Sequence, residues 1–197
     1  MNKISLKNIA TKVIDLEINA LKILKKSVNK NFDRAVNTIV NCQSKIILCG
    51  VGKSGLIAAK IASTLSSVGS PAFSLSANDC LHGDLGSITK KDVLILISNS
   101  GKSEEIIPII KFANRNKIKL IGIVSKKNSF LYKGADIKIL LPKVKESGLG
   151  IVPTSSTSIQ LAIGDALAIA SLKKKQFSKY DFSKINPGGN LGKQIKT

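Results

Sequence analysis

The stretch Lys45 to Val68, KIILCGVGKSGLIAAKIASTLSSV, decides the fold. An apolar run over Lys45–Cys49 leads through the turn GVGKSG at 50–55 into a helical pattern over Ser54–Val68. A short apolar run without polar alternation is typical of a strand that is covered on both faces. The order of strand, glycine-rich turn and helix therefore predicts the first unit of a parallel α/β sheet.

The same alternation continues along the chain. Four more apolar runs follow, at Ala72–Leu75, Val93–Ile97, Leu120–Val124 and Ile137–Leu140. The further helical patterns are Ser103–Asn116, a short piece near Asn128–Tyr132, and Ser156–Leu172. We therefore predict an α/β fold with a doubly wound, five-stranded parallel sheet flanked by helices. Ligands bind such sheets outside the carboxyl ends of the strands, at the switch point of the topology.

The two ends of the chain add helices and a tail. Apolar residues recur at three- and four-residue steps in two series, which predicts two N-terminal amphipathic helices: Ile9, Val13, Leu16, Ala20 and Leu24, then Val28, Phe32, Val36 and Ile39. These helices carry no catalytic cluster, so we expect packing or subunit contacts from them. We interpret the chain, 1–197, as one domain with N-terminal helices at 1–43, an α/β core at 44–175 and a polar tail at 176–197 that contains a tight loop at Pro187-Gly188-Gly189.

The charge of the chain raises the question of nucleic acid. The formal net charge is +19, but nearly all basic residues are lysines scattered along the chain, with Arg34 and Arg115 the only arginines, and aromatic residues make up 4%. Base recognition favours Arg, and single-strand binding uses stacked aromatic side chains. We therefore predict no nucleic-acid partner and a lysine-rich surface that attracts anionic metabolites.

The longest apolar runs have the length of a strand, which predicts neither a membrane span nor a signal peptide. The three cysteines, Cys42, Cys49 and Cys80, are odd in number and have no C-x-x-C spacing. This pattern argues against a disulfide framework and against a zinc site. We expect reduced thiols in a cytoplasmic protein and no metal site.

Two GKS triplets suggest a nucleotide loop, but their spacing is wrong. A Walker A motif needs a glycine five residues before the glycine of GKS, and those positions hold Ile47 and Leu96. The glycines of GVGKSG do fit the dinucleotide pattern G-x-G-x-x-G. However, Asp79 lies beyond a serine-bearing turn and not at the tip of the next strand, so the nucleotide hypothesis rests on one weak motif.

Two hydroxyl-rich segments point to phosphate binding. Ser98, Ser100 and Ser103 surround a glycine at the end of the most apolar strand, where a helix N-terminus adds free N–H groups. A simple helix cap needs only one serine, so we favour a cradle for the phosphate of a small ester. The segment 153–158, PTSSTS, leads into the last helix; part of it must cap that helix, and we expect other hydroxyls to face the ligand.

Several segments occur in one order along the chain: GVGKSG (50–55), LHGDLG (81–86), SNSGKSEE (98–105), Lys145-Glu146, PTSST (153–157), GDALA (164–168) and PGGNLG (187–192). In this order the chain resembles the sugar isomerase (SIS) domain of arabinose-5-phosphate isomerases. The resemblance covers almost the whole chain, and HGDLG, SNSG and PTSST are its specific strings. It implies that GVGKSG approaches a sugar phosphate and that no cofactor is used. The implied reaction interconverts D-arabinose 5-phosphate and D-ribulose 5-phosphate through an enediol, the first step towards Kdo.

The resemblance also implies roles for individual residues. Lys53 would steady the substrate oxygens and the charge of the enediolate. Glu146 would remove the carbon-bound proton, with Glu105 as the alternative base. His82 would move protons between oxygens or open the ring, because imidazole gains and loses protons near neutral pH. The implied substrate- and phosphate-binding residues are Gly52, Ser54, Ser98, Ser100, Ser103, Thr154, Ser155, Ser156 and Thr157.

The chain departs from the family pattern at three places. Asn186 stands before Pro-Gly-Gly where the family usually has a catalytic histidine, and Asn cannot carry a proton at neutral pH. Leu56 stands where a histidine often follows GKSG, and the segment between Lys145-Glu146 and PTSST is one residue shorter than in the family. Asn186 keeps a second hypothesis open, a non-catalytic sugar-phosphate sensor. Isomerisation of another phosphosugar is a third.

Two expectations concern the assembly. Longer family members carry two CBS domains that these 197 residues do not include, so we expect no regulation through them. Sugar isomerase domains commonly share sites between subunits, so the resemblance implies a homo-oligomer, with a tetramer expected.

Overall fold

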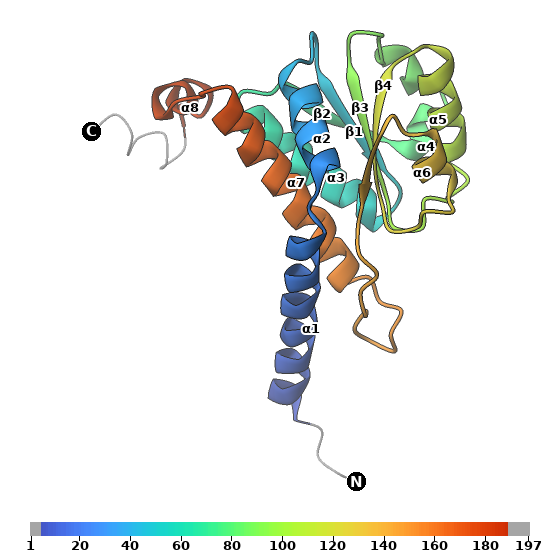
Figure 1. Cartoon of the computed structure of the whole chain (residues 1–197), viewed down its shortest axis with the longest axis vertical. Coiled ribbons are helices and arrows are strands. Elements are labelled where there is room, and N and C mark those ends of the chain that lie inside the picture. The colour runs from blue at the N-terminus through green and yellow to red at the C-terminus, as the bar shows by residue number, and fades with distance from the viewer. Residues whose placement is uncertain (1–4, 189–197) are drawn as a thin grey trace.

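A five-stranded parallel sheet forms the centre of the computed structural model, which describes residues 5–188 (Figure 1). The sheet order is β2-β1-β3-β4-β5 with every pairing parallel. All five predicted strands are confirmed, as β1 (Ile46–Gly50), β2 (Ala72–Ser76), β3 (Val93–Ser98), β4 (Lys119–Val124) and β5 (Ile137–Leu140). The strand order reverses between β1 and β3, so the switch point lies at these two central strands.

Helices cover both faces of this sheet. One layer is built from α1 (Leu6–Ser27), α2 (Lys30–Val40), α3 (Lys53–Ser67) and α7 (Ser155–Lys174). The other contains α4 (Ala77–Cys80), α5 (Ile106–Arg115) and α6 (Phe130–Gly134). The predicted doubly wound α/β fold and both N-terminal helices are therefore confirmed.

The central strands explain the apolar runs. Ile46 and Leu48 of β1 point into the layer of α3 and α7, whereas Ile47 and Cys49 point into the layer of α5. Every residue of β1 and β3 is buried. Both faces must therefore be apolar, because a buried polar side chain without a partner destabilises the fold.

Two segments differ from the expected helices. The helix expected from Ser103 begins at Ile106, because the residues before it form a loop in which Gly101 has φ +64°. The tail, expected to be polar coil, contains α8 (Lys179–Ile185), which starts with a capping box between Ser178 and Asp181. Of the predicted loop at 187–189, Gly189 lies outside the described residues.

Helix α1 is only partly covered by the rest of the chain. Its C-terminal half packs against α7 and buries Ala20 and Leu24. The N-terminal half extends beyond the body of the molecule (Figure 1), and Ile14 and Ile18 are exposed. The predicted amphipathic helix is present, but part of its apolar surface has no partner within the described chain.

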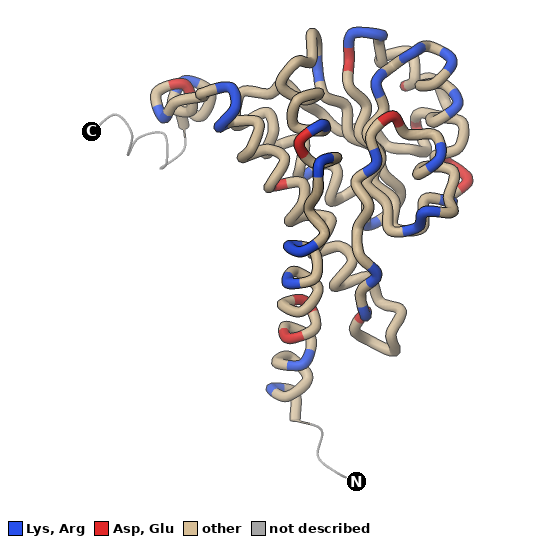
Figure 2. Tube along the Cα trace, in the orientation of Figure 1, with Lys and Arg blue, Asp and Glu red and all other residues tan. Residues whose placement is uncertain are grey.

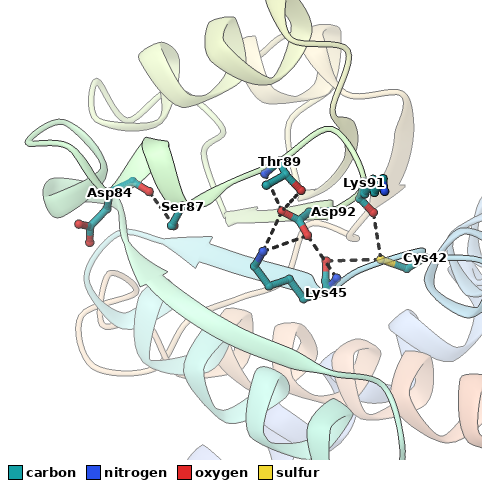
Figure 3. A network of polar contacts seen from close by, with 7 residues as sticks. All are labelled: Cys42, Lys45, Asp84, Ser87, Thr89, Lys91 and Asp92. Atoms are coloured by element: carbon teal, nitrogen blue, oxygen red, sulfur yellow. Dashed lines mark hydrogen bonds and ion pairs between the residues drawn. The ribbon is translucent and has the colours of Figure 1, made fainter.

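At the amino edge of the sheet, the Asp92 carboxylate joins the starts of β1 and β3 (Figure 3). It accepts hydrogen bonds from the Thr89 N–H at 2.6 Å, the Thr89 hydroxyl at 2.9 Å, and the N–H and Nζ of Lys45, both at 3.2 Å. Burial alone would raise the pKa of Asp92, but hydrogen bonds from Thr89, Ser44 and Lys45 outweigh it and lower the pKa to about 2. The ionised carboxylate therefore stabilises the register of the two central strands.

We predict that Asp92→Asn lowers the free energy of unfolding at pH 7 by about 2 kcal/mol. Because the pKa is lower in the folded state, this stabilisation is complete above the unfolded pKa near 4 and disappears as the pH falls towards 2. Urea unfolding between pH 2 and 7 measures the difference between variant and wild type.

The control for this experiment is Asp165→Asn, because Asp165 forms an exposed ion pair with Lys60. Exposed pairs contribute about 0–1 kcal/mol, so its effect should be smaller. A constant difference between Asp92→Asn and wild type across the pH range would contradict the proposed role of the charge.

Candidate functional site

A cavity of about 410 Å³ lies beyond the carboxyl ends of β1 and β3. Its size falls within the range of small-molecule sites, and its position is the predicted switch point. Three segments line it: Val51, Lys53 and Ser54 after β1, Asn99 after β3, and then Glu146, Gly150, Ile151, Pro153, Ser156, Thr157 and Gln160 from the loop before α7 and its first turns.

The glycines of GVGKSG allow β1 to turn directly into α3. Gly52, at the N-cap of α3, has φ +57° and ψ −127°, a conformation that side chains other than glycine strongly disfavour. A Cβ on Gly50 would lie 2.8 Å from the Ser54 carbonyl, and one on Gly55 would lie 2.8 Å from the Gly50 oxygen. The glycines therefore bring the N-terminus of α3 against the strand end, which places Lys53 and Ser54 at the cavity.

Lys53 is the first residue of α3 and is exposed at the cavity. No carboxylate of the described chain pairs with its ammonium group. Its charge is therefore available to an anionic ligand. The basic residues elsewhere are spread over most elements, as Figure 2 shows.

Glu146 is held by the N-terminus of α7. Its Oε2 accepts hydrogen bonds from the N–H of Thr154 at 3.0 Å, the N–H of Ser156 at 3.2 Å and the Thr154 hydroxyl at 3.3 Å. These backbone donors belong to a helix terminus and have no partner within the helix. Glu146 thus performs the capping that the sequence analysis assigned to the hydroxyls of 153–158.

This arrangement also sets the charge and orientation of Glu146. Burial raises the pKa of its carboxyl, but the hydrogen bonds from Ser156 and Thr154 outweigh burial and lower it below the ordinary value. The side chain is therefore ionised at neutral pH. The hydrogen bonds from the two N–H groups and from the Thr154 hydroxyl all use Oε2, which leaves lone pairs of Oε1 for a ligand in the cavity that Glu146 lines.

The serine loop lies beside this cavity and is ordered by its own hydrogen bonds. The Ser98 hydroxyl accepts from the Gly101 N–H at 3.0 Å, and the Ser100 hydroxyl accepts from the Lys102 N–H at 3.3 Å. A hydroxyl that accepts one bond can still donate its own proton, so both serines retain a donor. Asn99 is the loop residue that lines the cavity, whereas Ser100 lines a separate cavity of about 390 Å³ with Lys102, Ser125, Lys126, Lys127 and Asn128.

Other residues proposed for the site lie outside the cavity lining. His82 is exposed in the turn between α4 and the 3-10 helix Asp84–Ser87. Glu105 and Ser103 are half-buried just before α5. Ser155 is fully buried, and its hydroxyl finds no partner among the described residues. The structure therefore gathers Lys53, Ser54, Glu146, Ser156 and Thr157 around one cavity.

Asn186 lies at the opposite end of α3 from Lys53. Its side-chain amide donates to the carbonyls of Phe182 at 3.0 Å and of Ser67, the last residue of α3, at 3.4 Å. A helix rises about 1.5 Å per residue, so the 15 residues of α3 separate its ends by about 20 Å. Asn186 therefore cannot reach the cavity of its own chain in this arrangement.

The sequence analysis missed two polar residues of the lining, Asn99 and Gln160. Asn99 lay within the quoted serine loop but received no role. Gln160 is the one polar residue in the apolar run from Ile159 to Ile163. That contrast is the signal that could have identified it.

Comparisons with known proteins identify the family of the chain. Residues 39–170 match the family model described as SIS domain. The arabinose 5-phosphate isomerase KdsD of Yersinia pestis is 42% identical over 93% of this chain and 56% of its own length. The Francisella tularensis KdsD is 43% identical over 95% of this chain and 59% of its own length. A solved structure, the E. coli CFT073 protein c3406 in complex with arabinose 5-phosphate, has a TM-score of 0.90 and 34% identity over 95% of this chain and 100% of the other.

The chain thus spans somewhat more than half of the length of these curated relatives. Among the helices that the structure describes, none has the length and apolar character required to span a membrane. The matched segment includes the glycine turn, the serine loop and Glu146, and therefore most of the cavity lining.

Proposed function

The chain belongs to the SIS domain family, and from this membership we propose that it is an enzyme. We infer that it is a phosphosugar isomerase of this family and that its reaction is the interconversion of D-arabinose 5-phosphate and D-ribulose 5-phosphate. The observation that carries the proposal is the presence of a free ammonium, Lys53, and an anchored carboxylate, Glu146, in one cavity of the described chain. The KdsD relatives and the arabinose 5-phosphate complex of c3406 support the choice of sugar.

Aldose–ketose isomerisation moves one proton between C1 and C2 of the open-chain sugar. A base removes the proton beside the carbonyl, and negative charge then develops on the carbonyl oxygen. We assign the first task to Oε1 of Glu146, since Oε2 is held by α7. Lys53 stabilises the enediolate, because a fixed positive charge stabilises a developing oxyanion. The proton then returns to the neighbouring carbon.

Hydroxyls would bind the phosphate. Ser156 and Thr157 line the cavity, and Ser98 and Ser100 keep free O–H donors in the adjoining loop. We assign phosphate binding to these residues together with Ser103, and ring opening or proton transfer between oxygens to His82. His82 does not line the cavity, so this role requires a ligand that extends towards α4 or a movement of that turn.

A first test is incubation of the purified protein with arabinose 5-phosphate in deuterated water, followed by NMR of C1 and C2. We expect ribulose 5-phosphate to form, with solvent deuterium entering at the carbon that exchanges its proton with Glu146. Binding without conversion or exchange would instead support the sugar-phosphate sensor that Asn186 suggests. If the protein converts a different phosphosugar and not arabinose 5-phosphate, the proposed isomerase reaction stands but the proposed substrate is wrong.

A second test separates the two candidate bases. Glu146→Gln should lower kcat by about 10²- to 10⁴-fold, the contribution typical of a general base. Its carboxamide oxygen can still accept from α7, so the fold should persist. Glu105→Gln and the exposed control Glu104→Gln should each change kcat by less than about tenfold. Loss of activity in Glu105→Gln with retention in Glu146→Gln would assign the base to Glu105.

We also propose that the chain assembles into a homo-oligomer, a tetramer with shared sites. The exposed isoleucines of α1 have no partner in the described chain; Ile151 is exposed where it lines the cavity, and Leu149, two residues before it, is exposed as well. Apolar surface of this kind is typical of protein interfaces. Asn186, about 20 Å from its own cavity, would serve only the site of another copy.

We predict that Ile14→Asp with Ile18→Asp produces a smaller assembly than wild type, because charges would be buried at the subunit contact. Sedimentation velocity at micromolar concentration measures the mass. Asn19→Asp, an exposed polar position on the same helix, is the control and should leave the mass unchanged. A monomeric wild-type protein would contradict the proposal.

A further inference from the structure

Gln160 combines burial with access to the cavity. It lies in the second turn of α7 and is 1% exposed, yet it lines the cavity with Glu146 and Lys53. Buried polar side chains are usually fully hydrogen-bonded, because an unpaired polar group in the protein interior is destabilising. Its hydrogen bonds therefore show which of its atoms are available to a ligand.

Ser54 occupies the oxygen end of this amide. The Ser54 hydroxyl, in the first turn of α3, donates to Gln160 Oε1 at 3.2 Å. A glutamine amide has one acceptor oxygen and two N–H donors. The hydrogen bond thus fixes which end of the amide faces α3 and leaves the nitrogen on the other side.

The amide nitrogen of Gln160 donates no hydrogen bond within the described residues. It is also absent from the fully enclosed side-chain polar atoms without a partner in this part of the chain, which are the hydroxyls of Ser147, Ser155 and Ser171. Since the nitrogen has no partner among the described residues and is not fully enclosed, and since Gln160 lines the cavity, we infer that its donors open onto the space that a ligand would fill.

Helix packing holds Gln160 in this position. Gly164, one turn further along α7, lies so close to Ile61 of α3 that a Cβ at position 164 would overlap the Ile61 side chain. Ser54 is two turns before Ile61 on the same face of α3. The close contact fixes the spacing of the helices and therefore the distance between Ser54 and Gln160. A donor held in this way needs little reorganisation to bind a ligand.

The position of Gln160 relative to Glu146 suggests which ligand group it meets. Ser156, whose N–H binds Glu146 Oε2, precedes Gln160 by four residues, or about 6 Å along the helix. That distance is a few carbon–carbon bonds of an open sugar chain. A neutral amide donor suits a hydroxyl more than a phosphate, for which Lys53 and the serine loop offer charge and several donors.

We propose that Gln160 is a specificity-determining residue whose amide N–H groups donate to a sugar hydroxyl on C3 or C4, with Ser54 as its positioning residue. The proposal rests on the proposed isomerase function. It deepens that function by naming the group that distinguishes a polyhydroxylated sugar phosphate from a deoxy analogue. Sites built to hydrogen-bond a substrate hydroxyl discriminate strongly against the analogue that lacks it.

The test combines one variant with three ligands. Gln160→Met keeps the length of the side chain and removes its donors. Wild type, Gln160→Met and the control Gln43→Met, which alters an exposed residue at the amino edge of the sheet, are assayed with arabinose 5-phosphate and its 3-deoxy and 4-deoxy analogues. We expect Gln160→Met to lower kcat/KM for arabinose 5-phosphate roughly 10- to 100-fold, mainly through KM. Gln43→Met should match wild type.

The analogues separate hydroxyl recognition from a structural role. For wild type, kcat/KM with one of the two deoxy analogues should be lower than with arabinose 5-phosphate by a factor similar to that of the substitution. With that analogue, Gln160→Met should have the same kcat/KM as wild type, because the hydroxyl that Gln160 would bind is absent. Equal losses with all three ligands would identify Gln160 as a structural residue and overturn the proposal. If Gln160→Met does not fold, the wild-type measurements still test the proposal, because an equal kcat/KM for all three ligands would overturn it.

The role of Gln160 can be tested even if the proposed isomerase function is wrong. Absence of turnover by wild type on arabinose 5-phosphate would contradict the isomerase alone. The same three ligands are then compared by calorimetric binding. Wild-type affinities that distinguish one deoxy analogue, with the distinction lost in Gln160→Met, would support the role of Gln160, and equal affinities would reject it.

Discussion

The contact between Gly164 of α7 and Ile61 of α3 is the constraint on which the site depends. A Cβ at position 164 would overlap the Ile61 side chain, so that side chain packs directly against the backbone of α7 at Gly164. The N-terminus of α3 follows β1 and that of α7 follows the loop of Glu146, which brings two helix N-termini to one cavity. Both ends present positive dipole ends, an arrangement suited to anions, although two N–H groups at the start of α7 already donate to Glu146. The packing of two helices thus forms one cavity from segments that are far apart in the chain.

Glu146 introduces negative charge into this positive environment. Its carboxylate satisfies the donors of α7, and those hydrogen bonds lower its pKa, which also weakens it as a base. A weak but correctly oriented base is compatible with catalysis when the carbon acid is made more acidic. Lys53 can do this, since no carboxylate of the described chain neutralises it. In the proposed reaction, stabilisation of the enediolate by Lys53 and positioning of the Glu146 carboxylate by α7 are therefore complementary.

The sequence predicted the sheet well because its signals are local. Runs such as Val93–Ile97 are apolar since both faces of the strand are buried, and the glycines of GVGKSG are required by a turn that only they can make. Contacts between segments that are far apart in the chain could not be predicted from such local patterns. The delayed start of α5 follows from Gly101, which packs against Ser129 and Val124 in a left-handed conformation. Gln160 was missed because its role depends on Ser54, 106 residues away, and α8 was missed because its polar residues resemble a tail.

The positions of Asn186 and His82, both outside the cavity lining, are consistent with a site that a second copy of the chain completes. The described residues that line the cavity include a carboxylate and an ammonium group but no imidazole. His82 lies in the turn after α4, and Asn186, at the position of the family histidine, lies near the far end of α3. If a second copy packs along α1, residues at the far end of one chain can approach the cavity of another. Ile151, an exposed apolar residue of the cavity lining, lies where such a neighbour would have to seal the cavity from water. Exclusion of water strengthens the interaction of Lys53 with an enediolate. A shared site would therefore supply both the missing surface and the low-dielectric environment that the isolated chain lacks.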